Sequence, residues 1–165
     1  IHERLVGSEM CIRDSYRDVR GKYKMCIWDF NSACDNYSHP VTEPQHFELQ
    51  YNVWYYMLSK DEDFMNAVIE RYRALRQGVL SDAYLNGYMD AVVEWLGPAV
   101  DRNFSVWGYA LDKDMLSPAE RNPHTHTEAV AQMKRFCTER GAWMDENIDI
   151  LRQHSHESKN KKFNH

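Results

Sequence analysis

Residues 59–78 read SKDEDFMNAVIERYRALRQG, and they decide the fold prediction for this chain. Ser59 and Glu62 are three residues apart, which is the spacing of a capping box at a helix start. Gly78 is the type of residue that ends a helix in a left-handed conformation. Between them, apolar side chains recur at helical spacing, at Phe64, Val68, Tyr72 and Leu75. The stretch therefore predicts an amphipathic helix with these four side chains in the core.

Helical patterns continue on both sides of this stretch. Residues 46–58 are aromatic-rich and partly in helical register, and Ser81 with Asp82 starts a helix that Gly97 and Pro98 interrupt. After a short helix and a polar connection over residues 108–123, a second capping box at residues 125–128 opens the longest helix. The apolar positions that we assign to the core are Phe47, Val53, Trp54, Met57, Leu85, Tyr88, Met89, Val92, Leu96, Val100, Phe104, Trp107, Val130, Met133, Phe136, Cys137, Trp143, Met144, Ile148 and Leu151. Residues 46–153 are thus predicted to be helical, with a polar tail over residues 154–165.

Upstream of the helices the pattern changes to that of a β-hairpin. Residues 22–27 alternate between the two faces of a strand, and Arg20 with Gly21 forms a tight turn to a preceding strand. The predicted hairpin covers residues 16–30, and a polar loop follows over residues 31–45. The fold class is therefore mainly α with a short N-terminal β-hairpin, in one domain without internal repeats.

Composition limits the classes of function. The chain has 165 residues, 43% of them hydrophobic, and a net charge of −5, which argues against a nonspecific nucleic-acid binder. No apolar run approaches the roughly 20 residues of a membrane span, and no signal peptide is visible. The four cysteines, Cys11, Cys26, Cys34 and Cys137, form no C-x-x-C pair. Two H-x-H pairs, His124 with His126 and His154 with His156, read as solvated histidines, with a zinc site as the alternative.

The first residues are treated separately. The segment LVGSEMCIRDS, residues 5–15, resembles a translated sequencing adapter. We therefore exclude residues 1–15 from fold prediction as an artefact or a disordered segment. A natural loop is the alternative interpretation.

Residues 22–37, KYKMCIWDFNSACDNY, hold the best lead to function. Asp29 lies at the end of the predicted strand, between Trp28 and Phe30. A carboxylate at a strand end is a common Mg²⁺ ligand in phosphate-transfer enzymes. An Asp at a strand-to-turn junction can equally cap its own backbone. The residues alone leave both interpretations open.

Several motifs in a fixed order extend this lead. Residues 16–22 have the form Y-x-D-x-x-G-K, and residues 26–31, CIWDFN, are close to an I-P-W-D-F-D pattern. DEDF at residues 61–64 runs into RYRALR at residues 71–76, and then come RNF at residues 102–104, Trp107, Arg140 and WMD at residues 143–145. From residue 16 to the last helix, the chain resembles the C-terminal part of the CotH kinase family, the spore coat protein H-type atypical protein kinases. The resemblance implies the C-terminal helical part of an atypical protein-kinase-like domain.

The resemblance also implies a ligand site. Asp29 corresponds to the acid that binds Mg²⁺ in kinases, and Asn31 stands where the family has a second acid. Asn36 matches an Asn near the end of the motif that caps the loop or approaches the nucleotide, so ATP and Mg²⁺ are the implied cofactors. Asp35 replaces a Gly of the family pattern. The arginines Arg73, Arg76, Arg102 and Arg140 fit family positions, and we interpret them as anchors for acidic loops, with phosphate contacts as the alternative.

The implied activity is transfer of the ATP γ-phosphate to Ser of a coat or surface protein, at the spore coat or cell surface. A kinase also needs a phosphate-clamping lysine, a nucleotide-covering loop and a catalytic base. We expect these upstream of Asp29, so no catalytic residue is assigned in this chain, and the chain alone is expected to be inactive. A non-catalytic spore coat protein that uses its helices as a docking surface is the alternative.

Overall fold

The computed structural model describes residues 15–16, 19–22, 24–25, 34, 36 and 53–156. The helices are α2 (Val53–Leu58), α3 (Glu62–Arg76), α4 (Asp82–Leu96), α5 (Ala99–Trp107) and α6 (His126–Asn147). Short 3-10 helices follow at η4 (Gly108–Ala110), η5 (Ala119–Arg121) and η6 (Ile148–His154). The mainly helical prediction is confirmed. The part of the first predicted helix over residues 46–52 lies outside the described residues.

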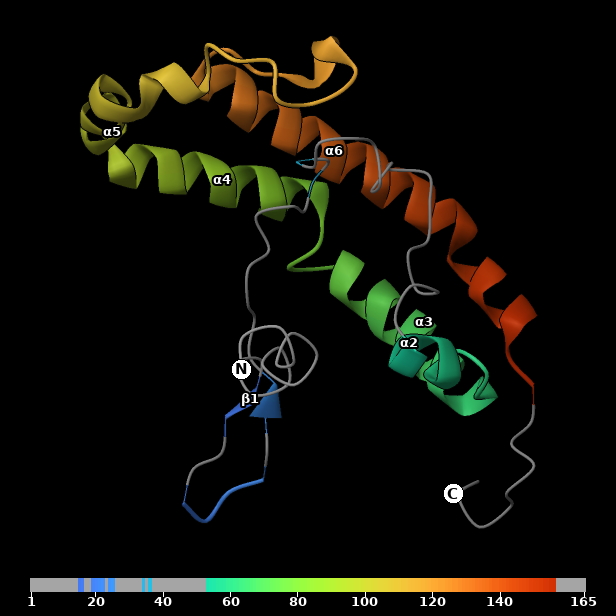
Figure 1. The fold of residues 1–165 in the computed structure, drawn as a ribbon. Coiled ribbons are helices and arrows are strands. Elements are labelled where there is room, and N and C mark those ends of the chain that lie inside the picture. The colour runs from blue at the N-terminus through green and yellow to red at the C-terminus, as the bar shows by residue number, and fades with distance from the viewer. Residues whose placement is uncertain are drawn as a thin grey trace, which may run out of the picture.

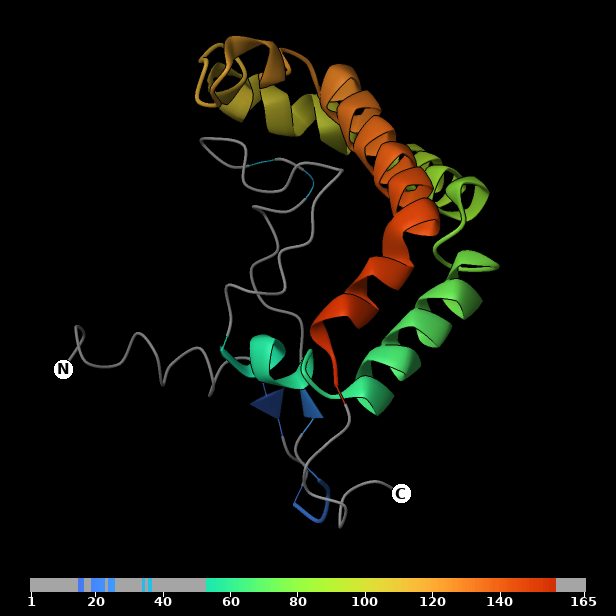
Figure 2. The same ribbon diagram turned by 90° about the vertical axis from the view of Figure 1, so that its right-hand side faces the viewer.

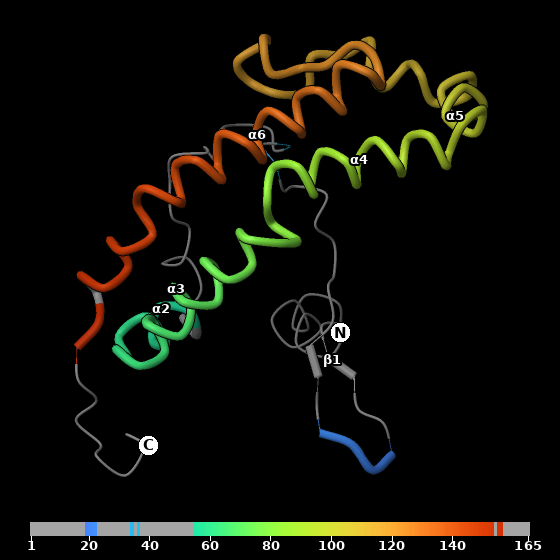
Figure 3. The backbone as a smooth tube through the Cα atoms, turned by 180° about the vertical axis from the view of Figure 1, so that it is seen from behind, coloured from blue at the N-terminus to red at the C-terminus, as the bar shows by residue number. Residues whose placement is uncertain are grey.

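One long helix organises this part of the chain (Figure 1). The first half of α6 runs antiparallel to α4, and its continuation into η6 runs back along α3. Seen from the side, α3 and α4 follow one another along the same flank of α6 (Figure 2). The short helix α5 turns the chain at the far end, and the view from behind shows the same order (Figure 3).

The helix starts follow the capping residues, with one correction. Ser81 caps α4 by accepting from the Tyr84 N–H at 3.2 Å, and Thr125 caps α6 by accepting from the Glu128 N–H at 3.1 Å. The predicted cap at Ser59 is wrong. Asp61 caps α3, accepting from the Phe64 N–H at 2.8 Å, whereas the Ser59 hydroxyl donates to the Tyr56 carbonyl at 2.7 Å. The negative charge of a carboxylate also interacts favourably with the positive N-terminal end of the helix dipole. The helix cap therefore lies two residues later than predicted.

The buried core lies between α3 and η6. Its members are Met65, Ile69, Ile148 and Leu151, with Val68, Tyr72 and Met144 packed against them. Ile148 and Leu151 were predicted, but Met65 and Ile69 were not. Phe64, which we assigned to the core, is 38% exposed. The predicted Val68 and Tyr72 pack against this core, so the packed face of α3 includes them but is centred on Met65 and Ile69, and it leaves Phe64 exposed.

Other predicted core positions are solvent-exposed. Tyr88, Leu96, Trp107, Met57 and Met133 are all exposed by more than a third of their surface. Within the described residues, no residue of α4 is fully buried, and in α6 only Gly141 is. The fully buried core therefore lies between α3 and η6 and not between α4 and α6.

Two very short strands are present near the N-terminus. Ser15–Tyr16 (β1) pairs antiparallel with Lys24–Met25 (β2), with Ser15 opposite Met25 and Tyr16 opposite Lys24. Most of the predicted hairpin over residues 16–30 and of the predicted loop over residues 31–45 lies outside the described residues. The hairpin and the loop therefore stay predictions.

The end of the described chain returns to the start of α3. The His156 N–H donates to the Lys60 carbonyl at 3.0 Å, next to a parallel bridge between Asp61 and His156. This contact joins the end of the described chain to the residues just before α3. Within the described ranges, no helix combines the length and the apolar character needed to cross a bilayer.

Candidate functional site

The predicted metal ligands Asp29 and Asn31 lie outside the described residues. Asn36, the predicted nucleotide neighbour, is described and is solvent-exposed. The metal and nucleotide roles of these three residues therefore stay predictions. What the structure adds is the set of contacts among the described helices, together with the surroundings of Cys34.

Cys34 and Cys137, which lies in the middle of α6, are both partly buried and influence each other's pKa. The hydrogen bond from Cys137 lowers the pKa of Cys34 to about 7, because it stabilises the thiolate. The same bond, together with burial, raises the pKa of Cys137. Cys34 also has a positive φ of 56°, which is uncommon for a residue with a side chain.

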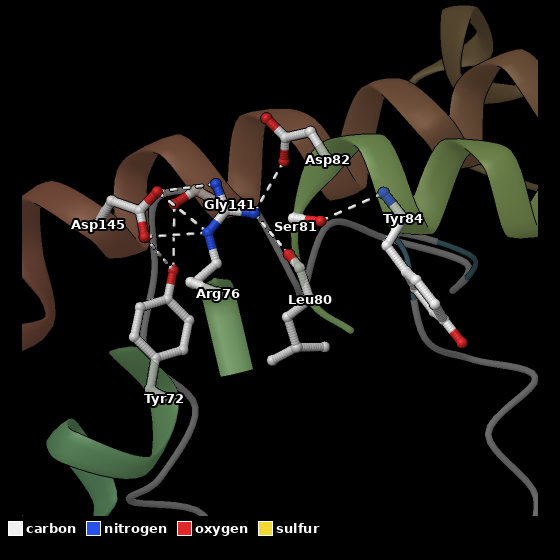
Figure 4. A network of polar contacts seen from close by, with 8 residues as sticks. All are labelled: Tyr72, Arg76, Leu80, Ser81, Asp82, Tyr84, Gly141 and Asp145. Atoms are coloured by element: carbon white, nitrogen blue, oxygen red, sulfur yellow. Dashed lines mark hydrogen bonds and ion pairs between the residues drawn. The ribbon is translucent and has the colours of Figure 1, made fainter. Parts of the chain in front are cut away.

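Arg76 forms the densest polar network in the described part of the chain (Figure 4). Its Nε lies 3.0 Å from both carboxylate oxygens of Asp145 on α6, and its Nη2 lies 2.7 Å from one of them. Its Nη1 donates to the Leu80 carbonyl at 2.6 Å and to Asp82 Oδ1 at 2.9 Å. One guanidinium therefore holds the end of α3, the start of α4 and the last turn of α6 together.

Tyr72 completes the network one turn earlier on α3. Its hydroxyl lies 2.8 Å from Asp145 Oδ1 and 3.2 Å from the Gly141 carbonyl (Figure 4). Burial raises the pKa of Tyr72, and the bond to Asp145 adds to this. The hydrogen bonds from Arg76 hold the pKa of Asp145 below its usual value, and the bond to Asp145 raises the pKa of Arg76. The groups are therefore in their ordinary charge states, as a structural ion-pair cluster requires.

Gly141 is what lets the guanidinium lie against α6. A Cβ at this position would lie 2.8 Å from Arg76 Nη1 and 2.9 Å from its Cζ. Such distances are shorter than van der Waals contact, so a larger residue must displace Arg76. The glycine inside a long helix therefore marks a close approach between two elements.

Gly141→Ala tests this close approach. Alanine favours helix formation, but here it pushes Arg76 from its partners, so we expect a net loss of about 1–2 kcal/mol in the free energy of unfolding. The matched control is Gly87→Ala in α4, where an added Cβ has no neighbour within 4 Å. That change should stabilise the protein by about 0.5–1 kcal/mol. Urea unfolding of both variants measures the difference, and equal stabilisation by both substitutions contradicts the packing argument.

The other arginines at family positions have simpler surroundings. Arg73 Nη2 lies 2.5 Å from Asp149 Oδ2 at the start of η6, and both side chains are about half exposed. Arg140 lies over the ring of Trp143 at 5.2 Å. Arg102 is exposed on α5. The interpretation of Arg73 and Arg76 as anchors for acidic residues is confirmed, although their partners lie on helices and not on loops.

The histidine pairs show no metal geometry in the described residues. His124 Nδ1 lies 2.9 Å from the Leu111 carbonyl, and the His126 ring packs against Phe104. Among the residues that the structure describes, no cluster of three or more His, Cys, Asp or Glu side chains is placed to hold a metal ion. The zinc alternative therefore gains no support from this part of the chain.

The sequence analysis did not predict this network, although the spacing of its residues is visible in the sequence. Tyr72 and Arg76 are four residues apart on α3, and Gly141 and Asp145 are four residues apart on α6, so each pair lies on one helix face. Cys137 lies on that same face of α6, one turn before Gly141. Nothing in the sequence alone shows that the two faces meet.

Comparison with known proteins now settles the family. The family model described as CotH kinase protein matches residues 14–144, which include the CIWDFN motif, α3, α4, α5 and most of α6. The chain belongs to the CotH kinase family. No curated protein and no solved structure matches this chain. Within the CotH kinase family match lie Tyr72, Arg76 and Gly141, so most of the polar network belongs to the region shared with the family.

Proposed function

We propose that this CotH kinase family chain is part of an atypical protein kinase that transfers the γ-phosphate of ATP to Ser of a coat or surface protein. The observation that carries the proposal is the family match over residues 14–144, because it contains the motif with Asp29. The proposal concerns the natural protein that contains this chain.

In this proposal Asp29 and Asn31 hold a Mg²⁺ ion. A carboxylate and a carboxamide oxygen are hard ligands of the type that Mg²⁺ prefers, and Asn31 keeps an oxygen ligand with one negative charge fewer than an acid. The ion, when bound, neutralises negative charge on the transferred phosphoryl group. Asn36, which is solvent-exposed, lies in the following segment and is proposed to approach the nucleotide.

The helices serve as the rigid support for this segment. The Arg76 network fixes α3, α4 and α6 relative to one another, with Tyr72 and Gly141 completing it. A site held on a fixed scaffold keeps its ligands in position, which phosphate transfer requires.

The test is phosphate transfer by the natural protein that contains this chain. The protein is incubated with ATP, with Mg²⁺ or with a chelator, and phosphoserine is mapped by mass spectrometry on the protein itself and on added coat proteins. The proposal expects phosphoserine only when Mg²⁺ is present. If no phosphoserine forms with Mg²⁺ and ATP, the kinase proposal is wrong for this protein.

One observation favours the second candidate, a non-catalytic coat or assembly protein. On α4, Tyr84, Tyr88 and Trp95 share one exposed face, with the two tyrosine rings stacked at 6.4 Å and Trp95 83% exposed. Exposed aromatic side chains in a row are typical of docking surfaces. The changes at Asn31 and Asp35 fit this candidate as well. It predicts no Mg²⁺-dependent phosphoserine, and it predicts that Trp95→Ser weakens incorporation of the protein into the coat.

A further inference from the structure

The exposed side of α4 carries a row of aromatic side chains. Tyr84, Tyr88 and Trp95 lie on one face of this helix, because their spacings of four and seven residues are close to one and two helical turns. Their exposed fractions are 51%, 61% and 83%. The rings of Tyr84 and Tyr88 stack at 6.4 Å, so they already form one surface. We call these three side chains the α4 aromatic face.

Small residues separate the two ends of the α4 aromatic face. Ala91 lies between Tyr88 and Trp95, about 5 Å from the first and about 6 Å from the second along the helix axis. Ala91 and Gly87, one turn before it, are both exposed. A flat group of a partner can therefore lie over Ala91 with an aromatic side chain on each side.

The charge around this face is negative. Residues 82–115 carry six acidic side chains and two basic ones, and α4 itself contains no Lys, Arg or His. Two of the three acids of α4 already pair with basic residues of α3 and α6. The third, Glu94, is exposed beside Trp95 and forms no ion pair within the described residues. A partner of complementary charge is therefore cationic.

Other aromatic rings of this fold are covered by cations of the chain itself. Lys113 lies 5.9 Å from the centre of the Tyr109 ring, and Lys60 lies 4.5 Å from the centre of the Tyr56 ring. A cation over the face of an aromatic ring gains electrostatic energy. Among the residues that the structure describes, no Lys or Arg lies over a ring of the α4 aromatic face. This face therefore combines exposed rings and negative charge without a cation of its own.

We propose that the α4 aromatic face binds an arginine-containing segment of a partner protein. One guanidinium lies over Ala91, between the rings of Tyr88 and Trp95, and forms an ion pair with Glu94. Arginine fits better than lysine, because its planar guanidinium stacks on aromatic rings and pairs with a carboxylate through two N–H groups. The inference rests on the docking surface of the second candidate function and names its partner, and it does not depend on phosphate transfer.

Fluorescence anisotropy with the whole chain and two labelled peptides tests this inference. The probe is a short peptide of alternating Arg and Gly, and the control peptide has citrulline, which is neutral, in place of every Arg. The Arg–Gly peptide should bind about tenfold more strongly than the citrulline peptide at physiological salt. Equal binding of the two peptides overturns the inference. Because the probe contains no Ser, this result is independent of the phosphoserine measurement, and either one can fail alone.

Substitutions in the face distinguish it from the overall charge of the protein. Trp95→Ser should weaken binding of the Arg–Gly peptide by about five- to tenfold, and Glu94→Gln by about threefold. Tyr109→Ser is the matched control. It also removes an exposed ring from residues 82–115, but that ring already holds Lys113, so binding should stay unchanged. Melting temperatures establish that the variants fold.

Two results contradict the assignment of this site to α4. The first is binding that Trp95→Ser leaves unchanged. The second is an equal loss of binding from Trp95→Ser and Tyr109→Ser, because overall charge and exposed aromatic area would then explain the interaction.

Discussion

Replacing Arg76 with Met is expected to lower the free energy of unfolding by about 2–4 kcal/mol. The side chain is only 12% exposed and binds two carboxylates and one backbone carbonyl. Met keeps much of the aliphatic volume but removes every donor. Asp145 then keeps only the Tyr72 hydroxyl as a partner within the network, and Asp82 loses its ion pair. Urea unfolding followed by far-UV circular dichroism measures the loss.

Arg73→Met is the matched control for this change. Arg73 lies on the same helix and also binds an aspartate, but its side chain is 51% exposed and that of Asp149 is 53% exposed. An ion pair in such surroundings contributes about 0–1 kcal/mol, because water screens it. If both substitutions lower the free energy of unfolding by a similar amount, the ion pairs of Arg76 contribute no more than an exposed ion pair does.

The effect of pH gives a second readout for Arg76. The folded protein holds the pKa of Asp145 below its usual value, so the ion pair adds stability above that usual value and loses it as the pH falls through the lowered pKa. The difference between the wild type and Arg76→Met should therefore be smaller at about pH 3 than at about pH 7. A difference that is independent of pH contradicts the ion-pair explanation and indicates lost packing.

Asp29→Ala is expected to slow phosphate transfer by about 100-fold or more, if the natural protein is a kinase as proposed. Under that proposal the carboxylate holds the Mg²⁺ ion, and alanine leaves Asn31 as the remaining ligand of the motif. The rate of phosphoserine formation at saturating ATP measures the effect. The melting temperature without nucleotide should be measured for both proteins, so that a loss of transfer can be separated from a loss of folding.

Asp63→Ala is the control for Asp29→Ala. Asp63 is an exposed acid in the first turn of α3 that does not cap the helix. Its removal alters the net charge in the same way and should leave the transfer rate unchanged. If the Asp29→Ala variant transfers phosphate as fast as the wild type, Asp29 is not a ligand of the metal ion.

The helices were predictable because their signals are local. Ser81 and Thr125 lie directly before the helices that they cap, and Gly97 ends α4 with a positive φ of 46° that glycine adopts at low cost. The choice of the buried face on α3 was not local. Periodicity allows both the Phe64 face and the Met65 face, and contact with Ile148 and Leu151 decides between them.

The polar contacts were less predictable because their partners are remote. Arg76 was identified as an anchor, but the sequence does not name Asp145 as its partner, since the two lie on different helices. For Asp29 and Asn31 the prediction came from the resemblance to the CotH kinase family, and the family match supports membership without testing the two ligands.

Asp29 is proposed to make ATP binding depend on Mg²⁺. Isothermal titration of ATP into the natural protein, with Mg²⁺ and with a chelator, tests this directly when wild type and Asp29→Ala are compared. We expect Mg²⁺ to strengthen binding to the wild type by tenfold or more, which corresponds to about 1.4 kcal/mol, and Asp29→Ala to abolish this gain. Binding that is equally strong with and without Mg²⁺ in the wild type, or a gain that Asp29→Ala retains, would contradict it.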